Sequence, residues 1–446
     1  MKRKITILTI AFLSSMLMYA NAFAAATGRC GDSITWTLDD SGNLTLSGSG
    51  EMWNNGYDDS PFKDYEIRKA TVKYGITSIG ESAFLGCRGM TELTLPNSVT
   101  SIGGNAFEGC SGLTELTLPN GVRSIGDSAF SGCSGLTELT LPNGVTSIGD
   151  SAFSGCSGLT ELILPNGVRS IGDFAFSLCS GLTELILPSS VTSIGDFAFY
   201  GCSGLTELTL PNSVTSIGDG AFRGCSGLTE LTLPNSVTSI GDGAFSGCSG
   251  LTELTLPNSV TSIGDCAFYG CTGLTELILP NSVSSIGDIA FTYCSGLEKI
   301  TVESGNSCYD SRDNCNSIID TEFNTLIVGC KNSVIPNSVT SIGYYAFYGC
   351  SGLTELTLPD SVASIGDGAF ICCSDLSKIT SLAEIPPVCG SGVFDRVNKT
   401  NCELIVPEGS VAAYKQAEVW NEFSNISGFS GVEVTVAGKT RKIVVE

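Results

Sequence analysis

Residues 113–135 have the sequence L-T-E-L-T-L-P-N-G-V-R-S-I-G-D-S-A-F-S-G-C-S-G, and close variants of this unit recur through the middle of the chain. The period is 23 residues. Its most regular column consists of phenylalanines: Phe84, Phe107, Phe130, Phe153, Phe176, Phe199, Phe222, Phe245, Phe268 and Phe291. A fixed period of this length indicates a solenoid, in which each unit buries its apolar face only against its neighbours. The sequence therefore predicts a β-rich repeat solenoid with a long repetitive surface, for which binding is a better expectation than catalysis.

Each unit contains the signals of a short strand and a corner. Leu116 and Leu118 are predicted to point inward and Thr117 outward, an alternation typical of a strand. Pro119 ends the strand because proline has no N–H for the ladder. After a second short inward-facing segment, Asp127 is predicted to cap a helical turn that carries the Ala-Phe pair into the core. Equivalent strands of stacked coils should then pair in parallel sheets, about 4.8 Å apart.

The composition argues against several classes of function. The chain has 446 residues, a formal net charge of −23 and no histidine. An acidic chain is a poor partner for nucleic acid or an anionic membrane surface. The absence of histidine removes the commonest general base and the commonest zinc ligand. The carboxylates repeat along an open face with no pocket signal, so we expect no enzyme, no cofactor and no metal site.

The first residues have the pattern of a targeting segment. Three basic residues at positions 2–4 precede an apolar run at positions 5–19, and small residues follow at positions 22–26. This pattern predicts that residues 1–26 are a signal peptide. An uncleaved anchor is the alternative, but the run is shorter than the roughly 20 residues that a spanning helix needs. With no later transmembrane segment, we expect an exported protein that is extracellular or on the cell surface, with the periplasm as the alternative.

The repeat is interrupted once. The regular cysteine column has a gap of 56 residues between Cys294 and Cys350, which fits one normal coil and one coil ten residues longer. This 33-residue coil lies within residues 303–335 and lacks the Ile-Gly-Asp-x-Ala-Phe segment. If it protrudes, it is a candidate recognition element; a structural insert is the alternative. The candidate residues of this coil are Tyr309, Asp310, Arg312 and Asp313.

The repeat pattern L-x-x-L-x-L-P-x-x-V-x-x-I-x-x-x-A-F-x-x-C resembles the BspA-type leucine-rich repeats of bacterial surface proteins. The resemblance implies an array of about thirteen 23-residue coils over residues 67–380, capped at both ends. It also implies a secreted or cell-surface adhesin that binds host extracellular-matrix or other cell-surface proteins. Two alternatives remain open: an envelope structural or assembly protein that contacts other bacterial components, and a glycan-binding module, against which the small number of expected exposed aromatic residues argues.

The two ends of the array have their own patterns. Residues 27–66 contain a hairpin signal, two alternating runs around a Gly-containing turn, and are predicted to form an N-terminal β cap module. Residues 381–430 are predicted to form a C-terminal cap with a short helix from Val411 to Trp420, N-capped by Ser410. Residues 431–446 alternate as a strand pair, a β tail of unknown role.

Glutamate and threonine repeat on the outward side of the first strand. They predict an acidic, hydroxyl-rich face, and a second column of aspartates does the same at the corners. This face is a candidate docking surface for a basic protein; a solvated face that blocks aggregation and a calcium-binding ladder are the alternatives. The candidate interaction residues are Glu115, Thr117, Glu138, Thr140, Glu161, Glu184, Glu207, Thr209, Glu230, Thr232, Glu253 and Thr255.

The cysteines form a further column. Cysteines at the same position of stacked coils have parallel side chains, so buried free thiols are favoured over disulfides there. Off-register cysteines are better disulfide candidates in an exported chain. The candidate pairs are Cys308 with Cys315 or Cys330, and Cys389 with Cys402, and the sequence does not decide between them.

Overall fold

The computed structural model describes residues 26–57, 59–436 and 439–444. Almost all of the predicted signal peptide therefore lies outside the described residues. Within the described part of the chain, no helix has the length and apolar character needed to cross a membrane.

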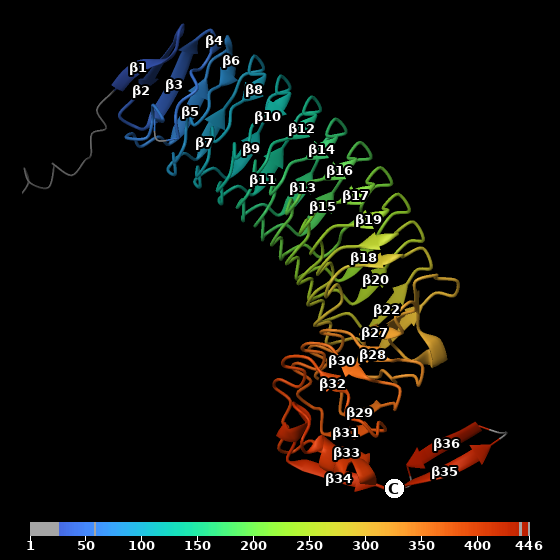
Figure 1. The fold of residues 1–446 in the computed structure, drawn as a ribbon. Helices are drawn as coiled ribbons and strands as arrows, with labels where there is room; N and C mark the ends of the chain where they lie inside the picture. The colour runs from blue at the N-terminus through green and yellow to red at the C-terminus, as the bar shows by residue number, and fades with distance from the viewer. Residues whose placement is uncertain (1–25, 58, 437–438, 445–446) are drawn as a thin grey trace, which may run out of the picture.

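The chain winds into a β-solenoid whose coils stack in a curved arc (Figure 1). It has about 17 turns of about 23 residues, more than the thirteen predicted. The difference arises because the end modules add strands to the array. At the start, β3 (Asn43–Gly48) pairs in parallel with β5 (Lys69–Val72). At the end, β34 (Asn425–Phe429) pairs in parallel with β33 (Glu403–Pro407).

One side of the coils forms a continuous parallel sheet of 11 strands, which we call the Ser-Ile sheet. Equivalent residues pair: Ser124 lies opposite Ser101 on one side and Ser147 on the other. The strands are β4 (Gly50–Glu51), β6 (Ile76–Ile79), β8 (Ser101–Ile102), β10 (Ser124–Ile125), β12 (Ser147–Ile148), β14 (Ser170–Ile171), β16 (Ser193–Ile194), β17 (Ser216–Ile217), β19 (Ser239–Ile240), β21 (Ser262–Ile263) and β23 (Ser285–Ile286).

A second line of strands, which we call the Glu row, follows the arc beside the Ser-Ile sheet (Figure 1). These strands pair in parallel and in register, but mostly in separate two-stranded pieces. The row comprises β5, β7 (Glu92–Thr94), β9 (Glu115–Thr117), β11 (Glu138–Thr140), β13 (Glu161–Ile163), β15 (Glu184–Ile186), β18 (Glu230–Thr232), β20 (Glu253–Thr255), β22 (Glu276–Leu279) and β24 (Lys299–Val302).

The phenylalanine column forms the centre of the core. The rings of Phe130 and Phe153 lie 5.3 Å apart at an interplanar angle of 4°, and this stacking continues from Phe84 to Phe291. Such ring pairs contribute about 0.5–1.5 kcal/mol each beyond the burial of their area. The predicted inward leucines are also buried, as Leu116 and Leu118 illustrate.

The cysteine column lies beside this stack as a ladder of free thiols. Cys133 Sγ donates to the carbonyl oxygen of Phe107 at 3.3 Å, and the same bond recurs in successive coils. All twenty cysteines are free in the structure, including the five off-register cysteines considered as disulfide partners. Of those five, Cys330 Sγ instead donates to the carbonyl oxygen of Asn316.

The N-terminal module contains the predicted hairpin, in which β2 (Ile34–Leu38) pairs antiparallel with β3. An additional strand, β1 (Ala26–Gly31), pairs with β2. Phe62 of this module extends the phenylalanine stack onto Phe84, with ring centroids 5.0 Å apart. The module therefore covers the first coil of the array.

The C-terminal helix is shorter than predicted. Only α2 (Val411–Tyr414) is α-helical, between the 3-10 turns η2 (Glu408–Ser410) and η3 (Trp420–Glu422), and the Ser410 side chain makes no capping bond. The reason is geometric, because both aromatic residues must reach the core. Tyr414 and Trp420 are fully buried, yet a continuous helix would place them about 120° apart around its axis.

The long coil separates the array into two parts. It contains β25 (Tyr309–Asp310), the 3-10 turn η1 (Arg312–Asn314), β26 (Ile318–Asp320) and β27 (Thr325–Val328). Its strands begin a new sheet, in which β27 pairs in parallel with β28 (Ser341–Ile342), followed by β30 (Ser364–Ile365) and β32 (Val388–Cys389). The Glu row resumes with β29 (Glu355–Leu358) and β31 (Lys378–Ser381), which leads to β33. The buried residues accordingly form two hydrophobic clusters.

The last described segment is the predicted strand pair. β35 (Gly431–Val436) and β36 (Lys439–Val444) pair antiparallel and extend beyond the final coil (Figure 1).

Candidate functional site

The structure places all twelve candidate residues of the glutamate-threonine face on the exposed side of the Glu row. Register brings equivalent residues together: Glu138 lies opposite Glu115, and Thr140 lies opposite Thr117. Glu207 lies in a coil without a strand in this row, but Thr209 in the same coil bridges to its neighbours on both sides. The result is one surface that crosses seven successive coils.

The charge of this surface is uncompensated in its middle and neutralised at its ends. At one end Lys69 Nζ lies 2.5 Å from Glu92 Oε2, and at the other Lys299 Nζ lies 2.5 Å from Glu276 Oε1. Among the described residues, no ion pair involves the glutamates between these ends. These seven residues, which we call the acidic run, are Glu115, Glu138, Glu161, Glu184, Glu207, Glu230 and Glu253.

Shallow grooves lie between neighbouring coils of the acidic run. One groove of about 540 Å³ is lined by residues that include Glu138, Thr140, Glu161 and Ile163. A second, of about 430 Å³, lies near Glu207 and Glu230. The sequence analysis missed the apolar component of this surface: Ile163 occupies the threonine position and is 53% exposed. The substitution of isoleucine for an outward threonine is visible in the sequence and could have revealed it.

The aspartate column does not form a free acidic surface. Asp127 Oδ1 accepts a hydrogen bond from the backbone N–H of Asp150 at 3.0 Å, and the same bond joins each coil to the next as far as Asp288. Each carboxylate therefore caps the following coil rather than a helical turn of its own. The glycine before each donor N–H leaves space for the carboxylate: a Cβ at Gly149, which precedes Asp150, would lie 2.6 Å from Asp127 Oδ1.

In the long coil, most candidate residues make contacts within the protein that stabilise the coil. Tyr309 is only 8% exposed, and its hydroxyl accepts the backbone N–H of Ile286 at 3.1 Å. Arg312 pairs with Asp310 at 2.8 Å and also donates to Asn324 Oδ1 at 2.9 Å. Asp313 alone of the four is exposed. The sequence analysis missed Phe323, which is 66% exposed in the turn between β26 and β27.

Burial makes the thiols of Cys133, Cys179 and Cys30 poor nucleophiles. Burial raises the pKa of Cys133 and of Cys179 to about 12, and that of Cys30 to about 11. The nucleophile in cysteine chemistry is the thiolate, so these groups stay protonated and inert near neutral pH. Within the described ranges, no three or more Cys, Asp or Glu side chains converge in a way that could hold a metal ion.

Comparisons with known proteins agree with this architecture. The BspA type leucine rich repeat region (6 copies) matches residues 57–162, 146–252, 216–324 and 316–410. A solved leucine-rich repeat protein from Bacteroides ovatus is 30% identical, with a TM-score of 0.63, over 90% of this chain and 99% of that one. A solved leucine-rich repeat protein from Eubacterium ventriosum is 25% identical, with a TM-score of 0.47, over 79% of this chain and 96% of that one. A solved leucine rich cell surface protein from Faecalibacterium prausnitzii is 23% identical, with a TM-score of 0.39, over 91% of this chain and 94% of that one.

A search of curated proteins finds no sequence match. The family match alone covers most of the array, including the long coil. Leucine-rich-repeat solenoids are typically non-catalytic scaffolds for protein–protein interaction. By its repeat, its coil geometry and this match, the chain belongs to the BspA-type leucine-rich repeat family.

Proposed function

We propose that the protein is an exported, cell-surface or extracellular adhesin that binds host matrix or other cell-surface proteins through its glutamate-threonine face. The observation that carries this proposal is the acidic run, seven exposed carboxylates in register without an ion pair among the described residues. Family membership supports the protein-binding role.

The energetics of the acidic run favour a binding role over a purely structural one. Like charges directly opposite each other in a sheet destabilise it. The chain has a remedy, since lysine pairs with glutamate at both ends of the run, at Lys69 and Lys299. Among the described residues, the glutamates of the seven intervening coils form no such pair with a lysine. A basic partner would relieve the repulsion on binding, and its approach would be accelerated by electrostatic steering.

Repetition adds a second advantage. Equivalent glutamates recur at every coil, so a partner with several basic segments can occupy several coils at once. Multivalent contacts of this kind raise the overall affinity without any new type of contact. The exposed Ile163 and Ile186 supply apolar area within the same face.

The test is binding of the mature protein to immobilised fibronectin, laminin and type I collagen at low and physiological salt. Glu161, Glu184 and Glu207 are changed together to Gln, and we expect at least tenfold weaker binding. A matched control changes Glu51, Glu322 and Glu418 to Gln, which removes the same charge from exposed sites outside the run. Equal binding by both variants would contradict the proposed face, and no binding by the unaltered protein would contradict the adhesin role.

The location is tested by protease shaving of intact source cells. We expect repeat peptides of this chain in the supernatant while a periplasmic control protein stays protected. Protection of the chain alongside that control would instead support the alternative of an envelope assembly protein.

A further inference from the structure

One edge of the solenoid carries most of the differences among otherwise near-identical coils. The residue between the Asp and the Ala of the Gly-Asp-x-Ala-Phe segment varies widely, whereas the following phenylalanine is the same in each coil. The residue after that phenylalanine, and in three places the glycine that precedes the cysteine, also vary. Along the array the first of these positions holds Ser128, Ser151, Phe174, Phe197, Gly220, Gly243, Cys266, Ile289, Tyr345 and Gly368.

The backbone at this edge is left-handed, so large side chains are unexpected there. Ile289 has a φ of 51° and Tyr345 a φ of 52°, values that favour glycine, which indeed occupies the position at Gly220 with a φ of 59°. The glycine before the cysteine is likewise replaced by Leu178, Tyr293 and Cys372, with φ values of 58°, 62° and 60°, and Arg396, at the equivalent place before Val397, has a φ of 66°. Bulky residues held in this conformation often mark functional sites.

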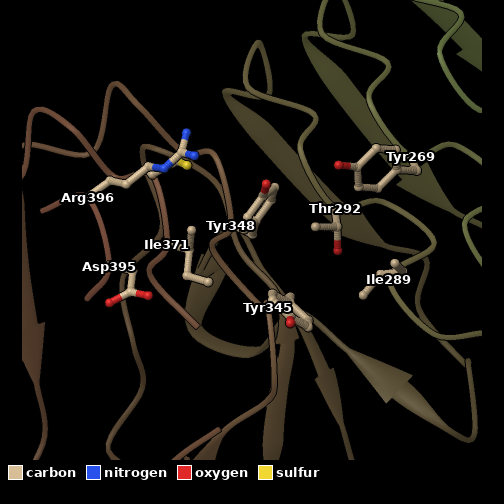
Figure 2. A pocket seen from close by; sticks show the side chains of 9 residues that line it. Tyr269, Ile289, Thr292, Tyr345, Tyr348, Ile371, Asp395 and Arg396 are labelled. Carbon is tan, nitrogen blue, oxygen red and sulfur yellow. The ribbon is translucent and has the colours of Figure 1, made fainter. Parts of the chain in front are cut away.

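Four of these left-handed residues, Ile289, Tyr345, Cys372 and Arg396, line one cleft of about 580 Å³, while Phe174, Leu178 and Phe197 have the same conformation outside it. Figure 2 shows Tyr269, Ile289 and Thr292 on one side, Ile371, Asp395 and Arg396 on the other, and Tyr345 and Tyr348 between them; Cys372 also lines the cleft. The two sides come from coils before and after the long coil. They meet because the long coil contributes little to this edge, and Tyr293 N–H donates directly to the carbonyl oxygen of Tyr348 at 3.2 Å.

Tyrosine dominates this region. Five of the 12 tyrosines of the chain form a continuous series of ring contacts, with centroids 5.5–6.1 Å apart. The series runs Tyr269, Tyr293, Tyr348, Tyr345 and Tyr344. Burial among these rings raises the pKa of Tyr269 above its ordinary value. The rings are therefore fixed in place before any ligand arrives.

We infer that this cleft binds a short segment of a neutral oligosaccharide. Its volume is within the range of about 300–1,000 Å³ in which proteins hold small ligands. A sugar ring has an apolar face of C–H groups, which fits a tyrosine ring, and a rim of hydroxyl groups, which fits the tyrosine and threonine hydroxyls. At the same wall the Asp395 carboxylate offers hydrogen-bond acceptors and the Arg396 guanidinium offers donors, and their opposite charges cancel.

A glycan is favoured over a second protein-docking surface by this lining. The cleft is lined by tyrosines and by one acidic and one basic residue, whereas the acidic run proposed for protein binding crosses seven coils and carries only acidic charge. The inference does not depend on the adhesin proposal, because the cleft residues occupy a different edge of the coils. The small number of expected exposed aromatic residues argued against glycan binding from sequence; the tyrosines that line this cleft, Tyr269, Tyr345 and Tyr348, are half-buried.

The test is affinity gel electrophoresis of the mature protein in gels that contain soluble starch, xylan, galactomannan or mixed-linkage β-glucan. We expect at least one of these neutral polysaccharides to retard the protein, and the change Tyr348→Ala to weaken its binding at least tenfold. Tyr200→Ala is the matched control, since Tyr200 lies on the same edge outside the cleft. No retardation by any of the four polysaccharides, or equal retardation of the Tyr348→Ala variant, would overturn the inference.

A second variant separates binding from folding. Arg396 occupies a left-handed position where most coils have glycine, so Arg396→Gly should leave the melting temperature unchanged or raise it. We expect the same variant to weaken polysaccharide binding by about three- to tenfold through loss of the guanidinium donor. Loss of fibronectin, laminin or collagen binding in the cleft variants, with no polysaccharide effect, would assign the cleft to a protein partner and overturn the glycan assignment.

Discussion

The two carboxylate columns of this solenoid repeat with the same period and have opposite roles. In the aspartate column each carboxylate accepts a backbone N–H of the next coil, at 2.8 Å between Asp196 and Asp219. In the acidic run the glutamates face each other across paired strands and form no ion pair among the described residues. The first column joins the coils, and the second is left to the solvent.

The sheets reflect this difference. The Ser-Ile sheet, which carries one charged residue, Glu51, at its paired positions, is continuous over 11 strands, while the Glu row from β9 to β24 divides into two-stranded pieces. Where lysine lies opposite glutamate at Glu276–Lys299 and at Glu355–Lys378, the paired strands are four residues long, although the Lys69–Glu92 pair joins a strand of only three residues. A repeated carboxylate thus stabilises the array where it accepts a hydrogen bond from the next coil, as in the aspartate column. It destabilises the array where it lies opposite the same carboxylate of the next coil, as in the acidic run.

The largest expected effect comes from obstructing the aspartate column. In Gly195→Ala, the new Cβ would lie 2.6 Å from Asp173 Oδ1 and 2.7 Å from the backbone of Gly172. Overpacking of this kind typically costs about 1–3 kcal/mol, which urea unfolding would measure. Gly104→Ala is the control, because its nearest neighbour would be 3.3 Å away, and an equal loss in both variants would show that the aspartate bond is not the cause.

Removal of one carboxylate should have a smaller effect. Asp196→Ala leaves the N–H of Asp219 without its acceptor at an exposed corner, for an expected loss of about 0.5–1.5 kcal/mol in the free energy of unfolding. Asp196→Asn keeps a side-chain oxygen acceptor and should lose less. If the two variants were equally stable, the hydrogen bond would not contribute.

Extension of the column should stabilise the array. Gly104 occupies the position at which an aspartate would begin the column one coil before Asp127. Gly104→Asp would place an acceptor beside the N–H of Asp127, with an expected gain of about 0.5–1 kcal/mol. Thermal unfolding checks this gain against Gly104→Asn and Gly104→Ala, and a lower melting temperature than in Gly104→Ala would refute it.

The smallest effect is expected in the acidic run. Glu184→Lys would face Glu161 across paired strands and reproduce the Lys299–Glu276 arrangement, with a gain of about 0.2–1 kcal/mol. Because salt screens exposed charges, this gain should shrink as the salt concentration rises. Unfolding at two salt concentrations tests it, and a gain that did not depend on salt would have another origin than charge.

Much of the architecture follows from the period alone. A phenylalanine and three leucines that recur every 23 residues can be buried together only if the coils stack in register, and Phe84 to Phe291 do so. The N-terminal hairpin follows from local alternation in the same way. The number of turns was underestimated because the end modules lack the repeat sequence but still form coils.

The cleft and the aspartate bonds depend on contacts that no local pattern specifies. Tyr269 and Tyr348 are far apart in sequence and meet only because the long coil leaves their edge free. The acceptor role of Asp127 depends on the position of the next coil, which the sequence of one unit does not contain. The short C-terminal helix likewise results from the need of Tyr414 and Trp420 to reach one core.

The break at the long coil has a consequence for cooperativity. Phe291 ends one aromatic stack and Phe347 begins the next, and the continuous sheet stops at the same place. In a solenoid, where stability passes only between nearest neighbours, a weak interface divides the array into segments that unfold separately. The tyrosine cleft is lined by residues from both segments. A sugar bound there would contact both segments and would therefore couple their unfolding.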